Sequence, residues 1–552
     1  DLLHREEAEP VLAALLSDSD VTIVGHNLAF DTAVIGEAYP ALQPLIWECY
    51  AAGRFFDTML ADQLEHIKLG TFRTSRFSLA AVVKRHFGTE VSGKEDGWRL
   101  KYHLLDQVTD IRQWPVEASR YAREDARLTW KLWDRLRHTL PTFQANVKAG
   151  FALHLMSAWG MRADPDRVAA LDTEMSANLE KESQVLIEKG LLRPNGKVDT
   201  KAVQALVVRA GVTETTPSGR PATGDRVLAR IQDPGIQALR RYRKSQKIST
   251  TYLPVLTQAT KTAVCPRYRV LVDSGRTSCS NPNIQNQPRT GGVRGAWTPR
   301  EGHFFMAADY AAAELSALGE VCLVKYGHSR LARQIQAGED PHLHMAARLL
   351  GIPYSQAHSI RHEDMVKKAR TLAKAANFGF AGYLSPASFL EYAEGFGVAI
   401  ALHEAKRLRQ KWFAEYPEMV MFFREISARC KHGQATITNP LCGFVRGGLF
   451  APAAANTMFQ TPIAIGAKLA LFEVARRCMH DRDDPMYGCY PVAFVHDEIV
   501  LEVPCTYDKL RVARSLKNAM ESQMAQVLRQ VPCGVEVSYG PQWTKAMRAL
   551  DL

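Results

Sequence analysis

The sequence predicts a multidomain α/β protein. Its 552 residues are too many for a single hydrophobic core, so several domains are expected. Residues 1 to about 145 mix short apolar strand candidates, such as 21–24, with helical patterns. Residues from about 146 to 262 are mostly helical, and strand and helix patterns alternate again from 263 onward.

The bulk composition narrows the class of protein. A formal charge of +11 indicates a polyanionic partner, although many basic proteins bind none. The ten cysteines form no CxxC pair, which argues against zinc and disulfides and fits a reducing compartment. No apolar run approaches a membrane span, so we expect a cytoplasmic protein. The chain starts at Asp1 without a signal-like stretch, which is typical of a fragment or a processed form.

The mostly helical region ends in a basic stretch that contains no acids. A solvated helix face would usually carry both signs of charge, whereas a surface that follows a phosphate backbone would exclude acids. We therefore expect Arg243 and Lys247 to contact phosphates, with a solvated face as the alternative. The basic residues between Asp233 and Asp273 are Arg240, Arg241, Arg243, Lys244, Lys247, Lys261, Arg267 and Arg269.

Two aspartates are predicted at strand ends in the C-terminal half. Asp497 interrupts the apolar run 494–501, which is typical of a hairpin whose turn carries carboxylates rather than Gly, Asn or Pro. A second apolar run, 304–308, ends on Asp309. Two carboxylates on strand ends suit a two-metal phosphoryl-transfer site. Either alone is more often a turn or cap residue.

Three polar segments bracket these aspartates, and each alone has an ordinary explanation. Residues 273–286 are rich in turn formers and are typical of a surface loop. Residues 370–379 predict a helix whose basic and aromatic face could hold a triphosphate and a base, or be solvated. Residues 456–460 carry two amides that could contact base edges or lie on the surface. The residues sharing a face are Arg370, Lys374 and Phe378 in the second segment, and Asn456 and Gln460 in the third.

The order of these motifs resembles DNA polymerases of family A, the bacterial polymerase I group. The resemblance covers most of the chain from about 150 to the end, and it implies a right hand of thumb, palm and fingers. The matching segments are 309–315 and 496–498 for the catalytic motifs, 370–379 for the fingers helix R-x3-K-x3-F, and 274–288 for the segment that leads into the palm. The expected domains are 146–262 for the thumb, 263–328 and 451–552 for the palm, and 329–450 for the fingers.

Residue by residue, the resemblance implies a DNA-directed DNA polymerase that adds dNMPs to a primer 3′ end. Asp309 and Asp497 would hold two Mg²⁺ ions, replaceable by Mn²⁺, with Glu498 beside them and Lys374 as a further catalytic residue. Glu314 would block a ribose 2′-hydroxyl. The implied nucleotide-binding residues are Arg370, Lys374, Phe378, His342, Glu314 and Tyr310. The implied primer–template contacts are Arg276, Asn283, Gln285, Asn286, Asn456, Gln460 and His496.

Two departures from the family pattern look more like phage members than cellular repair enzymes. The fingers helix ends in Gly382-Tyr383 where the family usually has Tyr-Gly, so the template-stacking position carries no ring. In the first catalytic motif, Ser316 stands where Arg is usual, and 311–313 are all Ala. We therefore expect a protein of phage DNA replication, acting in the host cytoplasm. We also expect a monomer. Its thumb has no room for a large insertion that recruits a processivity partner.

Residues 1–145 resemble a truncated RNase H-like 3′→5′ exonuclease domain. Asn27 and Asp31 lie in a segment similar to its second motif, and Tyr121 and Asp125 in one similar to its third. The resemblance implies metal binding by both aspartates and orientation of a water molecule by the tyrosine. The first motif, D-x-E, is not found before Val21. We therefore expect missing opening strands and no exonuclease activity, with a domain kept only as a scaffold as the alternative.

Two rival functions were weighed against DNA synthesis. A non-catalytic nucleic-acid-binding protein of polymerase shape would be expected to lack Asp309 or Asp497, but both are present. A polymerase of the same fold could copy or make RNA. Glu314 argues against ribonucleotide use, whereas the choice of template stays open.

Overall fold

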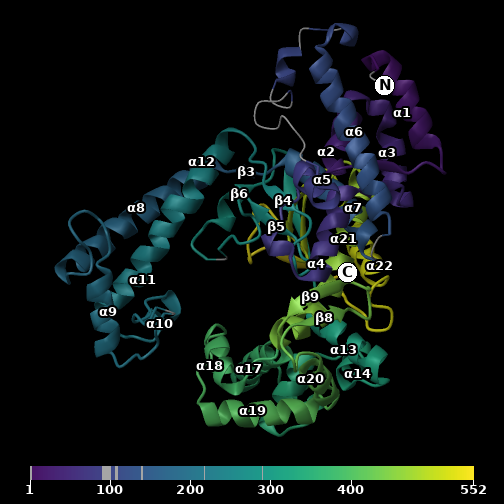
Figure 1. Cartoon of the computed structure of the whole chain (residues 1–552). Coiled ribbons are helices and arrows are strands. Elements are labelled where there is room, and N and C mark those ends of the chain that lie inside the picture. The colour runs from purple at the N-terminus through teal and green to yellow at the C-terminus, as the bar shows by residue number, and fades with distance from the viewer. Residues whose placement is uncertain are drawn as a thin grey trace.

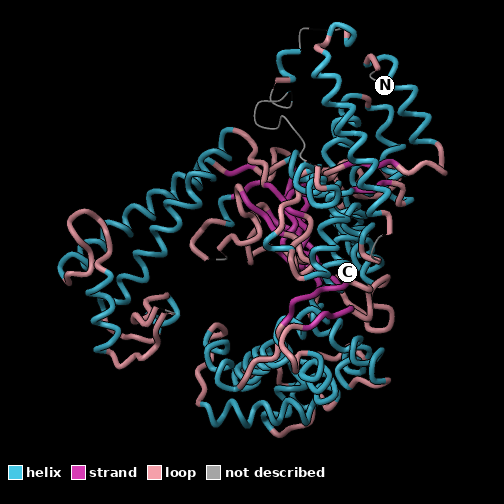
Figure 2. The backbone as a smooth tube through the Cα atoms, viewed as in Figure 1, coloured by secondary structure: helices cyan, strands magenta, loops and turns pink. Residues whose placement is uncertain are grey.

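The computed structural model describes residues 3–552 apart from 90–97, 99–100, 106–107, 109, 139–140, 217 and 289. Figure 1 shows a hand-like arrangement, with a helical arm on one side of a central body and a second helical part below it. Figure 2 shows that most strands gather at the centre. The multidomain α/β prediction is therefore confirmed.

A five-stranded antiparallel sheet forms the palm. Its strand order is β10-β11-β7-β12-β13. Because successive side chains point to opposite faces, Met306 and Ala308 of β7 pack in one core, and Phe305 and Ala307 pack in another. The palm elements are β4 (Arg267–Arg269), β5 (Ser278–Ser280), β6 (Trp297–Thr298), β7 (His303–Tyr310), α13 (Ala313–Tyr326), α21 (Ala451–Met479), β10 (Tyr490–Val495), β11 (Glu498–Pro504), α22 (Lys509–Met524), β12 (Val535–Gly540) and β13 (Arg548–Leu550).

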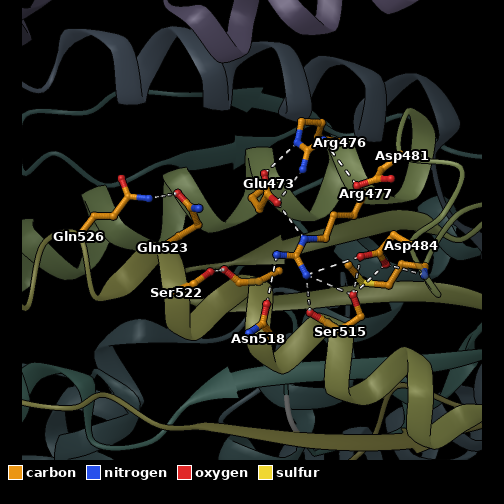
Figure 3. A network of polar contacts seen from close by, with 12 residues as sticks. Glu473, Arg476, Arg477, Asp481, Asp484, Ser515, Asn518, Ser522, Gln523 and Gln526 are labelled. Carbon is orange, nitrogen blue, oxygen red and sulfur yellow. Dashed lines mark hydrogen bonds and ion pairs between the residues drawn. The ribbon is translucent and has the colours of Figure 1, made fainter.

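A polar network joins the end of α21 to α22 behind the sheet. Arg477 donates to Glu473 at 2.8 Å on its own helix and to Asn518 at 3.2 Å on α22. Ser515 of α22 donates to Asp484 at 2.8 Å, in the loop that follows α21 (Figure 3). Charge-assisted bonds of this kind fix side-chain geometry as well as adding energy. They hold the end of α21 and the loop that follows it against α22.

The long helix α21 also passes the length and apolarity test for a membrane span, which the sequence analysis did not expect. It is the one helix of the described residues that does so, and 83% of its apolar window is buried inside the protein. Its burial against α7, α13 and α22 accounts for its apolar composition, because a helix that is apolar all round is typical of a protein core.

The thumb is the arm built from α8 to α12, and α8 packs along α11. The preceding helix α7 (Phe143–Trp159) lies instead against α21 and α2, where Phe151 and Met156 are buried. The arm therefore begins at Pro165 rather than at 146. Its elements are α8 (Pro165–Glu188), α9 (Thr200–Arg209), α10 (Asp225–Ala229), α11 (Pro234–Lys247) and α12 (Leu253–Lys261), and β3 (Arg162–Ala163) precedes it.

The fingers follow the first part of the palm and contact the tip of the thumb. Arg230, just after α10, lies 3.0 Å from Glu394 of α18, and Arg226 of α10 pairs with Glu391. The fingers elements are α14 (Arg330–Gln336), α15 (Pro341–Leu350), α16 (Tyr354–Ser359), α17 (Asp364–Ala381), α18 (Pro386–Glu394), α19 (Leu402–Glu415), α20 (Glu418–Arg429), β8 (Ala435–Thr438) and β9 (Val445–Leu449).

The N-terminal domain packs on the palm and on β9. Its described sheet has two parallel strands, with Ile23 opposite Phe55. At β9 the backbones of the two parts approach closely. A Cβ atom added to Gly447 would lie 2.2 Å from the carbonyl oxygen of Lys68. The elements are α1 (Arg5–Ser17), β1 (Ile23–Gly25), α2 (Leu28–Ala38), α3 (Gln43–Ala52), β2 (Phe55–Asp57), α4 (Thr58–Leu69), α5 (Leu79–Phe87) and α6 (Val116–Leu136).

We predict that Gly447→Ala destabilises this junction by about 1–3 kcal/mol, because the added methyl group meets backbone that cannot rotate away. Thermal and urea unfolding would measure the loss. Gly150→Ala is the matched control, since a Cβ there meets nothing within 4 Å and the residue lies in α7. It should leave stability unchanged or slightly raised. Equal unfolding midpoints for the two variants would contradict the packing argument.

Candidate functional site

The sheet brings Asp309 and Asp497 to the same end of neighbouring strands. Asp309 is the next-to-last residue of β7, and Asp497 lies in the two-residue turn between β10 and β11. Since Ile499 is opposite Ala308, the register places Glu498 beside Asp309. The predicted hairpin and strand end are both observed.

The turn itself has an unusual backbone. His496 has φ 64°, in the left-handed region that favours Gly and Asn. If this residue only had to close the hairpin, Gly or Asn would be expected in its place. Backbone strain of this kind is often found at functional sites. The side chain of His496 is exposed at the same end of the sheet as Asp497.

Negative charge is crowded around Asp497. Burial raises the pKa of Asp497 to about 6; the Arg276 guanidinium opposes this shift, and the carboxylates of Glu314 and Glu498 add to it. Burial together with the charges of Asp497, Glu521 and Asp309 also raises the pKa of the Cys533 thiol. The two aspartates therefore act on one common neighbour.

This crowding fits a divalent cation, which prefers carboxylate oxygens and would neutralise them. Among the described residues, no three or more His, Cys, Asp or Glu side chains are grouped so as to hold a metal ion. The sequence prediction that Asp309 and Asp497 hold the metal ions therefore stays a prediction. Water and substrate phosphates would complete the coordination, as is usual for Mg²⁺.

Glu498 is held by the C-terminal segment of the chain. It accepts a 2.9 Å hydrogen bond from the indole of Trp543 and lies 4.0 Å from Arg294. The Arg294 guanidinium stacks 4.2 Å from the centre of the Trp543 ring. Glu498 is therefore fixed beside the aspartates, and its two partners were not found from the sequence.

Glu314 sits at the start of α13 next to this site. Arg276 donates to Glu314 at 2.7 Å. Burial raises the pKa of Glu314, while Arg276 and a hydrogen bond from Gln460 oppose the shift. Three residues predicted from separate motifs thus meet at one carboxylate.

Tyr392 of α18 completes the surroundings of Glu314 and was missed by the sequence analysis. Burial and the nearby charge of Glu314 raise the pKa of Tyr392. Its ring packs on α17, where a Cβ on Gly379 would lie 3.0 Å from it. No local pattern connects Tyr392 with Glu314, because the contact joins elements far apart in the sequence.

The predicted stripe on α17 is observed. Arg370 and Lys374 are exposed, and Phe378 is half-buried on the same face. Arg370 donates to Asp340 at 2.6 Å, so in this structure its guanidinium already has one partner. Two cations and one ring remain arranged along the helix as the spacing predicted.

The structure places His342 differently from the predicted phosphate contact. It is 5% exposed and bonds to the amide of Asn377 at 3.0 Å. Burial lowers its pKa to about 4, so the ring is neutral near pH 7. Its centre lies 5.4 Å from that of the Phe378 ring. In this arrangement His342 supports the α17 stripe and supplies no positive charge.

Two other predicted contacts are turned inward. Tyr310 is 6% exposed, and its hydroxyl donates to the carbonyl of Met520 at 2.7 Å, on the face of the sheet opposite Asp309. Gln285 is 5% exposed, and its amide donates to Thr277 at 2.7 Å. Both side chains are bonded inside the protein, and their roles in nucleotide and DNA binding stay predictions. Asn283 and Asn286, from the same loop, are exposed.

The reversed Gly382-Tyr383 pair has a defined geometry. Tyr383 has φ 71°, the left-handed position after a helix that Gly usually fills. Its hydroxyl is hydrogen-bonded to Ser427 of α20, and its ring packs 4.9 Å from Phe423. A Cβ on Gly382 would lie 3.3 Å from the amide oxygen of Asn456. The exchange therefore anchors the end of α17 on α20 and leaves room for Asn456.

The basic stretch on α11 contains no acidic residue in sequence, but acidic residues of other helices lie next to it. Arg241 pairs with Glu182 of α8 at 2.7 Å, and Arg240 pairs with Asp225 of α10 at 2.8 Å. Arg243 is half-buried and donates to the carbonyl of Thr223. In this structure Arg243 is engaged within the thumb, and its contact with phosphate stays a prediction. Two lysines of α11, Lys244 and Lys247, remain exposed.

The exonuclease-like residues lie on two helices, and α6 packs against β1, the strand that leads into α2. Asn27 and Asp31 lie at the start of α2, whereas Tyr121 and Asp125 lie on α6. Burial and the charge of Asp57 raise the pKa of Asp31. Asp57 itself accepts four backbone N–H bonds at the starts of α2 and α4, which uses the acceptor capacity of a carboxylate. It is therefore a capping residue in this structure.

Residues 168–545 match DNA polymerase family A, which is more than half of the chain. The chain belongs to DNA polymerase family A. Residues 1–141 match the 3′-5′ exonuclease family, so the exonuclease-like domain precedes the polymerase as predicted. The activity of the family is DNA-directed DNA synthesis, with divalent metal ions.

Among its relatives, DNA polymerase I of Aquifex aeolicus is 27% identical over 577 residues, which cover 99% of this chain and 91% of that protein. Thermostable DNA polymerase I of Thermus aquaticus is 26% identical over 460 residues, covering 79% of this chain but only 52% of that protein. The chain thus spans about half the length of the Thermus relatives. Both named relatives are bacterial, and similarity to phage members stays a prediction.

A solved structure has the same fold. The polymerase domain of Pol1 from M. smegmatis, in complex with DNA primer–template and dNTP, has a TM-score of 0.71 and 20% identity, covering 98% of this chain and 89% of that chain. At this identity the similarity shows the fold alone.

The exposed lysines of α11 lead to a prediction about salt. Replacing Lys244 and Lys247 together by Ala should make the slope of log affinity for duplex DNA against log salt shallower by about one to two units, because fewer condensed cations are released on binding. Fluorescence anisotropy with a labelled primer–template would measure the slope.

The control removes two exposed charges from α19, at the outer edge of the fingers: Lys406→Ala with Arg407→Ala. This variant should keep the wild-type slope. If both double variants changed the slope equally, total charge and not the thumb surface would determine binding.

Proposed function

We propose that this family A polymerase extends a DNA primer by two-metal phosphoryl transfer at Asp309 and Asp497. The proposal rests on one observation: the carboxylates of Asp309 and Asp497 lie at one end of the sheet, Glu314 is close to Asp497, and Tyr392 near Glu314 packs on α17, the helix that carries the cationic stripe. A phosphate-binding helix and an acidic pair on one continuous set of contacts suit nucleotidyl transfer.

The carboxylates of the palm and the cations of α17 would have different roles in the reaction. Asp309 and Asp497 would hold two divalent ions, for which we propose Mg²⁺. The ions would activate the primer hydroxyl and neutralise the leaving pyrophosphate. Lys374 and Arg370 would hold the triphosphate from the opposite side, and Phe378 would stack on the base. To bind the triphosphate, the Arg370 guanidinium would exchange or share its present partner, the carboxylate of Asp340.

Sugar selection would depend on Glu314. Its carboxylate is held in one place by Arg276 and Gln460, so a ribose 2′-hydroxyl would meet a fixed group and not a mobile one. Primer–template contacts would come from His496, Asn456, Asn283 and Asn286, together with the lysines of α11. A DNA template, dNTP substrates and a monomeric, cytoplasmic enzyme complete the proposal.

The enzyme is proposed to act in phage DNA replication, on the basis of the departures at Ser316 and at Gly382-Tyr383. The N-terminal domain is proposed to support the polymerase and not to proofread, because the D-x-E motif is not found in its sequence and Asp57, near Asp31, caps α4.

Asp497→Asn should abolish primer extension while leaving primer–template affinity within a few-fold of wild type. A neutral amide keeps the shape of the turn but cannot help to hold two divalent ions. Extension assays with Mg²⁺ and anisotropy would measure the two properties. Asp483→Asn, an exposed aspartate in the loop before β10, serves as control. Near wild-type extension by the Asp497 variant would refute the assignment.

Glu314→Ala should raise incorporation of ribonucleotides relative to deoxyribonucleotides by at least about tenfold, because the group that meets the 2′-hydroxyl is removed. Single-nucleotide incorporation with matched dNTP and rNTP gives the ratio. Glu314→Gln has nearly the same size without the charge, and it should stay close to wild type. A loss of selectivity equal to that of Ala would show that charge, not bulk, selects the sugar.

A further inference from the structure

Arg276 reaches Glu314 from a tight turn in the palm. The amide of Gly275 donates to the carbonyl of Val272 at 2.9 Å, and the amide of Val272 donates to the carbonyl of Arg276 at 2.9 Å. Gly275 has φ 82°, a conformation that suits Gly alone among the common residues. The position of the Arg276 side chain is therefore set by the position of the turn.

The turn is held from outside by α21 and by two arginines. Thr461 of α21 donates to the carbonyl of Ser274 at 3.0 Å. Seven residues further along the same helix, Lys468 donates to the carbonyl of Gly275 at 2.7 Å. The carboxylate of Asp273 lies 3.2 Å from Arg446 and 2.7 Å from Arg73. Asp273, Ser274 and Gly275 thus each have a partner outside the turn.

Lys468 uses a buried ammonium group to bond a backbone carbonyl, which is an energetically costly arrangement. It is fully buried, with 0% exposure, and its second bond, at 2.7 Å, goes to the amide oxygen of Asn146 on α7. Both acceptors are neutral, and burial lowers the pKa of Lys468 to about 7. Burying an ammonium group without a carboxylate partner costs stability, and an apolar residue of similar volume would often be more stable. A role in folding alone does not explain this lysine.

We propose that Lys468, assisted by Thr461, is a positioning residue for sugar recognition: by holding the carbonyl of Gly275, it fixes the turn that presents Arg276 to Glu314. The inference rests on the proposed role of Glu314 in selecting the sugar. Lys468 and Thr461 are both fully buried, so each would act through the turn. The route is a chain of three contacts, from Nζ to the Gly275 carbonyl, through the turn, and from the Arg276 guanidinium to the carboxylate.

The test is Lys468→Met, which keeps the length of the side chain and removes both bonds. It should raise KM for dNTP and lower selection against rNTP, each by about fivefold, which is the effect of roughly one lost hydrogen bond. The value of kcat should change much less. Thermal stability should change little, because relief from burying an ammonium group offsets the loss of two hydrogen bonds to buried acceptors. A merely structural lysine would give the opposite combination, a loss of stability with unchanged selectivity.

Two further variants separate the contacts of Lys468. Asn146→Ala removes the bond to α7 and keeps the bond to the turn, so selectivity should stay at the wild-type value. Thr461→Val removes the second anchor of the turn with almost no change in volume, and it should lower selectivity in the same direction as Lys468→Met. If Lys468→Met does not fold, Thr461→Val still decides whether anchoring on α21 affects the sugar.

Hydrogen exchange gives a readout that does not depend on catalysis. In Lys468→Met, the amides of Val272 and Gly275 should exchange faster than in wild type, because the turn has lost an anchor. Unchanged exchange with unchanged selectivity would overturn the inference, and so would a selectivity loss in Asn146→Ala equal to that in Lys468→Met. If Glu314→Ala itself left selectivity unchanged, the proposed sugar gate would fail, while faster exchange and a raised KM for dNTP would still support positioning by Lys468.

Discussion

The palm depends on keeping several carboxylates close together at one end of a sheet. Asp309, Asp497 and Glu498 come from neighbouring strands, and Glu314 is near enough to disfavour the charge on Asp497. Like charges at this spacing destabilise the folded state unless a cation balances them. Arg276 and Arg294 supply part of that balance from within the chain. The sheet tolerates the remainder because β7 is buried on both faces and β11 is paired on both edges.

Local patterns in the sequence predicted the parts of the site that are local in space. An apolar run that ends on an acid predicted the strand end at Asp309, and four-residue spacing predicted the α17 stripe. Side-chain direction across the sheet could not be obtained in this way. Asp309 and Tyr310 are neighbours, yet they point to opposite faces, and only the covering helices show which face is the site.

The misplaced residues share a second cause, which is contact between distant elements. Arg240 and Arg241 lie in an acid-free stretch, but Asp225 and Glu182 reach them from other helices. Tyr392 lies beside Glu314 only because α18 folds back onto α17. The start of the thumb was placed too early for the same reason, since α7 is helical like the thumb but is buried against α21. Helical periodicity identifies a helix and says nothing about its partner.

The ion pairs between thumb and fingers give the protein a closed outline. From the palm, one can follow the thumb to Arg230, cross to Glu394, and return through the fingers to the palm. A long polymer enclosed by thumb, palm and fingers could leave only by sliding along its own axis or after the ion pairs between thumb and fingers break. Exposed pairs contribute at most about 1 kcal/mol each and weaken in salt. The contact between thumb and fingers is thus reversible. Because salt weakens it, retention of a bound polymer would depend on ionic strength even where the polymer itself carried no charge.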